Sequence, residues 1–287
     1  MKRVFMISSF VAGSNVGGSL AMKVLPLLGC ELSLLPTTML GRHPGWGAPG
    51  GGTVTDEMFV SMAEGLVAND VIKKADCIVT GYFASAAQVS EAARLIAAHK
   101  TDGTPVIVDA VMGDFGKGLY VKEEVAAAIV SELLPLAEII KSNAWEFWEI
   151  ERRKARVDSI PEAARDADAI KSHLGGDGSR SALQFVSSVE QGDEIGLLGA
   201  SQQGAFWSGH ARANGEHVPN GFGDFLTVLL ARDAVGGLKP VQNMLFNEMT
   251  VFTPVFGAHD FSEPSEFDIG ILPKALGKSK PARVITL

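Results

Sequence analysis

The feature that most restricts the fold of this chain is the alternation of short apolar segments with longer segments of helical periodicity. Residues after the first apolar segment show this periodicity up to Gly29, and it returns further along the chain. A strand followed by a helix and a second strand favours a parallel sheet. We therefore predict an α/β fold with a mostly parallel central sheet and helices on both faces. The predicted strands are 3–9, 30–36, 76–81, 104–110 and 137–141, and the predicted helices between them are 55–69, 86–99 and 121–136.

The second half of the chain has a different order of elements. Helices are predicted from residue 144 and over 159–173, the latter with Pro161 near its first turn. Residues after 262 have no clear pattern. Because the chain shows neither an internal repeat nor a clear linker, we predict one domain over residues 1–287. A β-meander at about 182–188, 194–200 and 204–210 precedes two helices, one from about 222 and one at about 240–251.

Polar residues follow the predicted strands at their carboxyl ends. These ends form one crevice in a doubly wound sheet, and ligands bind there. Residues 40–54 add a long loop rich in glycine and proline, which contains His43 and indicates a flap or a binding loop. The polar residues at strand ends are Ser9, Tyr82, Asp109, Asp114, Asn143 and Glu146.

The segment Gly221-Phe222-Gly223-Asp224 stands directly before an apolar helical run. Glycines allow a ligand to approach the main chain, and the first N–H groups of a helix bind anions. Asp224 fits such a site as a base that accepts a proton from a substrate hydroxyl. The same residue is also a suitable N-cap in a glycine turn, and the local sequence leaves both interpretations open.

Carboxylates gather in two of these segments. Asp109 and Asp114 leave the same strand, and Asn143 and Glu146 lie three residues apart at a helix start. Such oxygen donors suit Mg²⁺, which is often shared with substrate phosphates. Asn143 and Glu146 equally match a capping box, in which each side chain bonds to the backbone of the other residue.

Composition and motifs exclude several classes of protein. The net charge of −8 argues against nucleic acid and against a basic membrane-binding face. Cys30 and Cys77 suit a buried core, and no apolar run is long enough to cross a membrane, so we expect a cytoplasmic protein. Gly13-Ser-Asn-Val-Gly-Gly18 lacks the dinucleotide spacing, and there is no P-loop, zinc-ligand pair or serine hydrolase elbow.

Six segments resemble, in register, those of one enzyme family, the pyridoxal kinases of the ribokinase-like superfamily. The similarity covers nearly the whole chain. None of the six motifs is specific alone, but their shared order is. They are Ser9 to Gly18, His43-Pro-Gly-Trp46, Thr80-Gly-Tyr82, Val108 to Asp114, Ile140 to Glu146, and Gly221-Phe-Gly-Asp224.

This resemblance implies ATP-dependent phosphorylation of the 5′-hydroxymethyl group of pyridoxal, pyridoxine or pyridoxamine, by a homodimer. It makes Asp224 the base and Gly221, Phe222 and Gly223 an anion hole. The implied metal ligands for Mg²⁺ are Asp109, Asp114 and Glu146. The implied ATP contacts are Asp114, Asn143, Glu146 and Ser187, and the implied contacts to the pyridine ring are Ser9, Val16, His43 and Tyr82.

Four positions depart from the family pattern, of which Ser142, in place of the usual proline, is expected to be harmless. Phe222 stands where relatives have a smaller residue, and its ring either packs beneath the turn or crowds the nucleotide. Pro44 replaces a threonine that helps to hold the substrate ring. Lys141 replaces a threonine linked to a monovalent cation, so we hypothesise that its ammonium group substitutes for that cation. The alternatives are a hydroxymethylpyrimidine kinase and a catalytically weak protein that binds pyridoxal or its phosphate.

Overall fold

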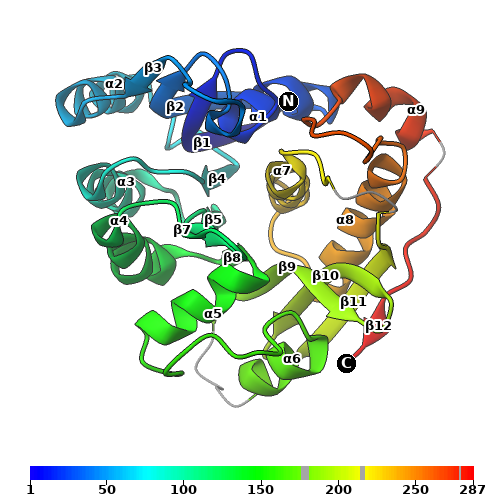
Figure 1. The fold of residues 1–287 in the computed structure, drawn as a ribbon. Coiled ribbons are helices and arrows are strands. Elements are labelled where there is room, and N and C mark those ends of the chain that lie inside the picture. The colour runs from blue at the N-terminus through cyan, green and yellow to red at the C-terminus, as the bar shows by residue number, and fades with distance from the viewer. Residues whose placement is uncertain (176–180, 214–216, 278) are drawn as a thin grey trace.

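Within the described part of the chain, the central sheet contains ten strands. The computed structural model describes residues 1–175, 181–213, 217–277 and 279–287. A separate hairpin joins β6 (Gly113–Asp114) to β7 (Gly118–Leu119). The order in the sheet is β12 (Ile285–Thr286), β11 (Gly204–Ala211), β10 (Glu194–Ser201), β9 (Leu183–Gln191), β8 (Ile139–Asn143), β5 (Val106–Asp109), β4 (Cys77–Thr80), β1 (Lys2–Val11), β2 (Cys30–Leu40) and β3 (Gly51–Thr53) (Figure 1).

The middle of this sheet is parallel and its two edges are antiparallel. Strands β2, β1, β4, β5, β8 and β9 run parallel to one another. Strands β10, β11 and β12 form the antiparallel meander, and β3 folds back on the end of β2. The predicted α/β fold with a mostly parallel sheet is therefore confirmed, and so is the late meander.

Alternate residues along the central strands build two cores. Val4 and Met6 belong to the core on one face of the sheet, whereas Phe5 and Ile7 belong to the core on the other. Successive side chains of a strand point to opposite faces, so a strand buried on both sides is apolar at every position. This is why the sequence shows continuous apolar runs instead of alternation.

Helices cover both faces of the sheet (Figure 1). One face carries α1 (Gly17–Leu27), α7 (Phe222–Ala234), α8 (Val241–Phe256) and α9 (Leu272–Leu276). The other carries α2 (Asp56–Ala68), α3 (Ala86–His99) and α4 (Glu123–Ala128). Toward the meander, α5 (Ala144–Arg153) and α6 (Ala167–Gly175) pack on the face opposite α8. Among the described residues no helix is long and apolar enough to span a membrane.

Several predicted boundaries were wrong. The helix expected over 159–173 begins only at Ala167, where the Asp166 side chain accepts a hydrogen bond from the N–H of Ala169 and caps the first turn, while Asp166 also forms an isolated β-bridge with Glu190. The helix expected over 121–136 is α4 followed by a π-helical turn and a short 3₁₀ turn that contains Pro135. The glycine-rich loop includes a 3₁₀ turn, Pro44–Trp46, and then strand β3.

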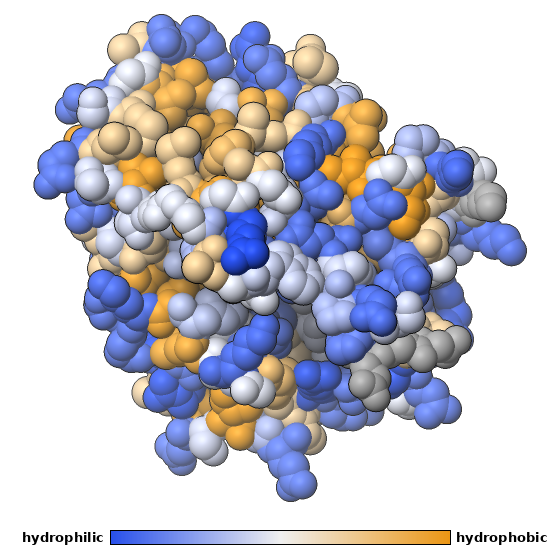
Figure 2. Space-filling model, turned by 45° about the horizontal axis from the view of Figure 1, so that its top comes forward, coloured by the Kyte–Doolittle hydropathy of each residue, from blue (hydrophilic) through white to orange (hydrophobic). Residues whose placement is uncertain are grey.

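The surface mixes residue types. Figure 2 shows one face of the molecule, where hydrophobic residues form separate patches among hydrophilic ones. Large apolar side chains that are exposed include Met22, Leu27, Met58 and Phe246, which come from three different helices. Scattered exposure of this kind is ordinary for a folded chain, so we assign no function to it.

Candidate active site

The turn before α7 is shaped by Gly221. Its φ angle is 108°, in the left-handed region that favours glycine, and a Cβ at this position would collide with the carbonyl oxygen of Asn15. The first hydrogen bond of the helix runs from the N–H of Phe225 to the Gly221 carbonyl, 2.8 Å away. The N–H groups of residues 222–224 are therefore outside the helix ladder, at its positive end. This arrangement can stabilise an anion.

Asp224 lies in the same turn and is partly buried. Burial raises the pKa of its carboxyl group to about 6, helped by the negative charge of Asp109. A hydrogen bond from the Gly17 backbone and the positive charge of Lys141 act in the opposite direction. A carboxylate that titrates near neutral pH suits a general base. Asp224 is therefore placed to take a proton beside an anion-binding turn.

A buried ion pair supports this turn from below. The Lys141 ammonium group lies 3.1 Å from each carboxylate oxygen of Asp109, and the Thr227 hydroxyl donates a hydrogen bond to the same carboxylate. A Cβ built on Gly223 would lie 3.4 Å from the Lys141 Nζ. Burial acts to lower the pKa of Lys141, but the carboxylates of Asp109, Glu146 and Asp224 raise it above its ordinary value. A permanent positive charge thus lies against the anion hole.

Glu146 and Asn143 form the capping box that their spacing permits. The Asn143 side chain accepts from the Glu146 N–H, and Glu146 accepts from the Asn143 N–H, both at 2.8 Å. The other oxygen of Glu146 accepts from the N–H of Met112 at 2.9 Å, and the Asn143 amide donates to the Gly113 carbonyl. Burial raises the pKa of Glu146 to about 7. These contacts hold the turn between β5 and β6.

The three predicted metal ligands do not form a ready ligand set. Asp109 is engaged by Lys141 and Thr227, and Glu146 is engaged by backbone N–H groups. Only Asp114 is exposed, with one oxygen 2.8 Å from the N–H of Phe115. No group of three acidic, histidine or cysteine side chains that could hold a metal ion occurs in the described ranges. Direct ligation by Asp109 and Glu146 therefore does not fit this geometry.

A cavity of about 720 Å³ brings together all of the residues predicted to contact ATP or Mg²⁺. Its apolar wall includes Met249, Phe252 and Phe256. Beside this wall, Phe222 is 6% exposed and packs against Phe267 and His259, so its ring lies mostly in the core beneath the turn. The predicted site residues that line the cavity are Asp109, Asp114, Asn143, Glu146, Ser187 and residues 221–224, together with Lys141.

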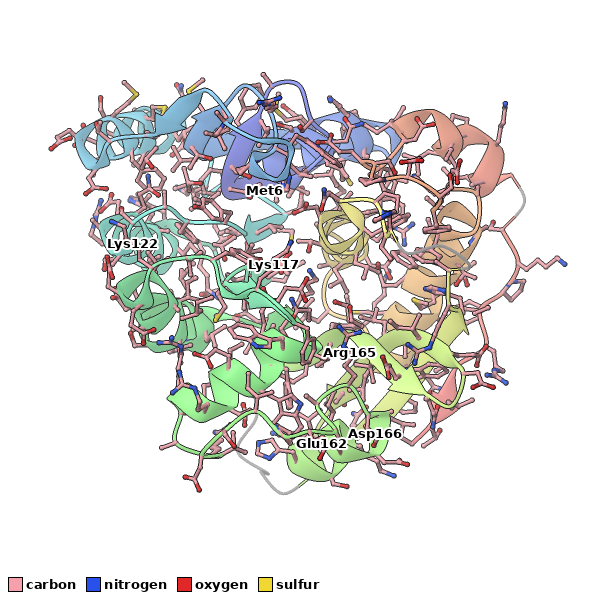
Figure 3. All side chains as sticks on the ribbon, in the orientation of Figure 1. Met6, Lys117, Lys122, Glu162, Arg165 and Asp166 are labelled. Atoms are coloured by element: carbon pink, nitrogen blue, oxygen red, sulfur yellow. The ribbon has the colours of Figure 1, made fainter. Side chains whose placement is uncertain are left out.

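Four ionisable residues that line this cavity were not predicted from the sequence: Tyr120, Arg165, His210 and Arg212. Arg165, labelled in Figure 3, stacks over the Phe115 ring with 4.4 Å to its centroid. Glu190 pairs with both arginines, at 3.5 Å from Arg165 and 3.0 Å from Arg212. Arg165 was not predicted as a site residue because its segment was assigned to a helix. No local sequence motif marks Tyr120, His210 or Arg212.

The four residues predicted to contact a pyridine ring lie elsewhere, at the carboxyl ends of β1, β2 and β4. The Ser9 hydroxyl lies against Gly17, the residue after Val16. The Gly17 N–H donates a hydrogen bond to the Asp224 carboxylate. The Tyr82 carbonyl, after β4, accepts from the Thr37 hydroxyl at 2.8 Å. None of the four lines the larger cavity.

His43 enters this region from the loop after β2. Its N–H donates to the Ser14 hydroxyl at 3.0 Å, and its ring accepts from the N–H of Gly45. The pKa of the His43 ring lies below its ordinary value, mainly because of burial. The Glu266 carboxylate opposes this shift, and Lys117 in the β6–β7 hairpin adds to it. The start of α7 therefore lies between two groups of loops, one from β5, β8 and the meander, and one from β1, β2 and β4.

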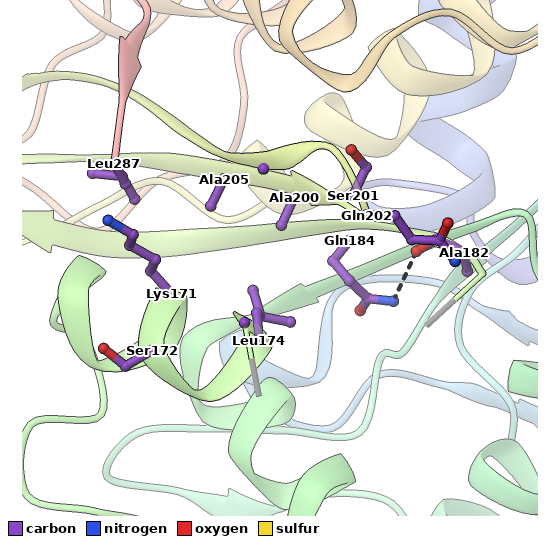
Figure 4. Close-up of a pocket in the computed structure, with 12 residues that line it drawn as sticks. Lys171, Ser172, Leu174, Ala182, Gln184, Ala200, Ser201, Gln202, Ala205 and Leu287 are labelled. Carbon is purple, nitrogen blue, oxygen red and sulfur yellow. Dashed lines mark hydrogen bonds between the residues drawn. The ribbon is translucent and has the colours of Figure 1, made fainter. Parts of the chain in front are cut away.

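A second cavity of about 580 Å³ lies between α6 and the strands β9 to β11 (Figure 4). Lys171 and Leu174 come from the helix, and Gln184 and Ala200 come from the strands. The Gln184 amide donates to the Ala182 carbonyl at 3.4 Å. This cavity shares no lining residue with the larger one, so it is separate from the Asp224 site.

Comparisons with known proteins agree on one relationship, although no family model matches the chain. A pyridoxal kinase PdxY of Deinococcus radiodurans is 26% identical over 234 residues, which cover 79% of this chain and 77% of the relative. The pyridoxal kinase of Entamoeba histolytica matches over the full length of both chains, with 24% identity and a TM-score of 0.84.

The structure of pyridoxal kinase from Leishmania donovani in complex with ADP and pyridoxamine matches equally completely, with 24% identity and a TM-score of 0.79. The curated relatives are pyridoxal kinases, and both of these solved structures, which share this fold, carry the same name. The chain is related to the pyridoxal kinases and has their ribokinase-like fold.

Proposed function

We propose that the protein is a single-domain, ATP-dependent kinase that phosphorylates the 5′-hydroxymethyl group of pyridoxal, and of pyridoxine or pyridoxamine. The observation that carries this proposal is Asp224, a carboxyl group with a pKa near 6, at an anion-binding helix start above a buried ammonium group. The named activity of the relatives supports the same reaction.

The cavity of about 720 Å³ is the proposed nucleotide side. Its apolar wall suits a base, and a relative with this fold is solved with ADP. The phosphates would extend from this wall toward the N–H groups of residues 222–224. Asp114, Asn143, Glu146 and Ser187 line the intervening surface. Arg165 and Arg212 add positive charge at the same cavity, which offsets part of the phosphate charge.

Asp114 is the residue on this surface that would hold magnesium, because its carboxylate is exposed. Asp109 and Glu146, whose oxygens are engaged by protein groups, would contribute negative charge beside the ion. Mg²⁺ prefers oxygen donors and keeps several waters, so this donor set suits an ion shared with phosphates. When bound, the ion neutralises phosphate charge in the transition state.

The pyridine ring would bind on the other side of α7, among Ser9, Val16, His43 and Tyr82. Val16 and Tyr82 offer apolar surface, and Ser9 and His43 offer polar groups to the ring substituents. Pro44 provides no side-chain hydroxyl, so this loop has one polar contact fewer than its relatives. This position leaves the substrate hydroxymethyl group next to Asp224, because Gly17 joins Ser9 to Asp224.

The chemical step then follows from the groups around α7. The ionised Asp224 accepts the proton of the substrate hydroxyl, and the hydroxyl oxygen attacks the terminal phosphorus of ATP. The bond to ADP breaks as the new bond forms, and the N–H groups of residues 222–224 stabilise charge on the transferring group. Lys141 adds a fixed positive charge directly below them.

Lys141 is proposed to take the place of a monovalent cation. Its ammonium group already satisfies Asp109 and raises the positive potential at the anion hole. The protein should therefore be active without added K⁺. We further propose a homodimer in the cytoplasm, as for the kinases that the sequence resembles.

The direct test is a coupled assay of ADP formation with pyridoxal, pyridoxine, pyridoxamine and hydroxymethylpyrimidine. Turnover highest with a B6 vitamer supports the proposal. Hydroxymethylpyrimidine also carries a hydroxymethyl group on a ring, so it is the competing substrate. A preference for it would overturn the substrate assignment. Tight binding of pyridoxal without turnover would show a binding protein instead of a kinase.

A further inference from the structure

A short segment between α8 and α9 connects loops that are far apart in sequence. Residues 265–267 run beside Asn220, directly before the catalytic turn. The Asn220 N–H donates to the Ser265 carbonyl at 3.0 Å, and the Phe267 N–H donates to the Asn220 carbonyl at 2.8 Å. Both partners are main-chain groups, so the position of this segment and the position of Gly221 are fixed together.

The side chain of Glu266 extends from this segment to two other loops. One oxygen accepts from the Trp46 indole N–H at 2.6 Å, and the other accepts from the Asn15 N–H at 2.9 Å. The Ser14 hydroxyl donates a further hydrogen bond to this carboxylate. The same hydroxyl accepts a hydrogen bond from the N–H of His43. One carboxylate therefore contacts the turn before α1 and the loop after β2.

The two loops that Glu266 contacts are those of the proposed pyridine side. Val16 follows Asn15 directly, and Trp46 lies in the loop 41–50, which we name the substrate loop. Asn15 is held a second time, because its side-chain amide donates to the Phe267 carbonyl at 2.8 Å. The groups that the Glu266 carboxylate contacts, in Ser14, Asn15 and Trp46, do not line the larger cavity, so its side chain acts on the pyridine side.

We propose that Glu266 is a positioning residue that ties the substrate loop and the Asn15 turn to the catalytic turn, so that the ring-binding groups and Asp224 are aligned by one carboxylate. The inference rests on the proposed kinase function. The carboxylate is ionised at neutral pH: burial raises its pKa, but hydrogen bonds from Ser14, Asn15 and Trp46 lower it below its ordinary value. Hydrogen bonds to an ionised acceptor are stronger than neutral ones.

The proposal predicts a specific kinetic pattern. Glu266→Ala removes all three contacts, so the KM for pyridoxal should rise about 10-fold or more and kcat should fall, while the KM for ATP stays unchanged. Glu266→Gln should show a smaller effect, because its amide oxygen still accepts one hydrogen bond. Trp46→Phe should raise the KM for pyridoxal, and should add little in the Glu266→Ala background.

Glu263→Gln is the matched control, because Glu263 is an exposed carboxylate three residues earlier. Hydrogen exchange gives a readout that does not depend on turnover. In Glu266→Ala, exchange should accelerate both in the substrate loop and at residues 220–224, with no change in the strands of the meander. Circular dichroism and the melting temperature show whether the variant is folded.

Three outcomes overturn the proposal: unchanged kinetics in Glu266→Ala, equal rises in both KM values, or faster exchange in only one of the two segments. A large loss of melting temperature with equal rises would show a general structural role. If the unmodified protein does not turn over any B6 vitamer, the proposed function fails instead. The exchange experiment still decides whether Glu266 couples the two segments.

Discussion

Asp224 sets the expected pH dependence at the scale of single residues. Burial raises its pKa to about 6, and only the ionised form accepts a proton. We predict that kcat/KM falls as the pH drops through about 6. We also predict that Asp224→Asn lowers kcat by about 10²–10⁴-fold, the usual contribution of general base catalysis. The measurement is a pH–rate profile with a melting curve for each variant, and near-normal turnover of Asp224→Asn would refute the role.

Lys141 leads to a second prediction at this scale. Lys141→Thr removes the ammonium group and leaves the Asp109 carboxylate without its buried partner, which is costly. We predict low activity that K⁺ partly restores in this variant, and no effect of K⁺ on the unmodified protein. Assays with KCl or tetramethylammonium chloride at equal ionic strength separate a bound cation from general screening. Equal K⁺ dependence of both proteins would contradict the substitution by Lys141.

Glu248 on α8 provides a prediction about stability. It is fully buried, and neither carboxylate oxygen has a hydrogen-bond partner in the described part of the chain. Burial raises its pKa well above the ordinary value. The folded state therefore binds this proton more tightly than the unfolded state, so the stabilisation is complete below about pH 4 and is lost as the pH rises.

Glu248→Gln stays neutral at every pH, so it should be more stable than the unmodified protein at pH 8. The gain should appear as about 2–4 °C of melting temperature for each kcal/mol, and should shrink at pH 5. Glu162→Gln, at an exposed position labelled in Figure 3, is the control. A Glu248→Gln protein that melts earlier at pH 8 would show that the carboxylate has a stabilising partner.

At the scale of elements, the start of α7 depends on Gly221. Alanine at this position would adopt an unfavourable left-handed conformation, and its Cβ would collide with the Asn15 carbonyl. We predict that Gly221→Ala lowers kcat at least 10-fold, because the N–H groups that follow it are displaced. Gly236→Ala is the matched control, since a Cβ there meets nothing within 4 Å. Equal activities of the two variants would show that the turn tolerates displacement.

The elements themselves were largely predictable. The helix 86–99 matches α3 at both ends, since Ser85 caps its first turn, and Thr55 likewise caps α2. Local hydrogen bonds of this kind are visible in sequence. The start of α6 was not visible in the sequence, because the preceding turn depends on an isolated β-bridge between Asp166 and Glu190 on β9.

The site was predictable to the same extent and for the same reason. Asn143 and Glu146 are neighbours in sequence, so their capping box could be expected. The contacts of Glu266 could not be expected, because its partners Trp46 and Asn15 lie more than 200 residues away along the sequence. The sequence suggested Asp109 as a metal ligand. In the fold, Lys141 on the neighbouring strand pairs with the Asp109 carboxylate.

At the scale of the whole molecule, the sheet order separates the two proposed binding regions. Strands β4, β1 and β2 carry the proposed pyridine side, while β5, β8 and the meander carry the cavity of about 720 Å³. The first helical turn of α7 lies between them. A substitution on one side should therefore change the binding of one ligand and not the other.

Arg165 tests this separation. It lines the cavity, stacks on Phe115 and pairs with Glu190, and neither of these partners belongs to the proposed pyridine side. We predict that Arg165→Gln raises the KM for ATP about 10-fold through loss of charge near the phosphates, with the KM for pyridoxal unchanged. Arg94→Gln, at an exposed site on α3, is the control. An equal change in both KM values would show that the two regions are not separate.

The buried position of Lys141 has a consequence for how the protein responds to its surroundings. A diffusible activator rises and falls with the ionic content of the solution, and an enzyme that needs one follows those changes. An ammonium group built into the chain is supplied once, during translation, and is present in every molecule at the same stoichiometry. The proposed role of Lys141 therefore predicts an activity that does not follow changes in the ionic content of the solution.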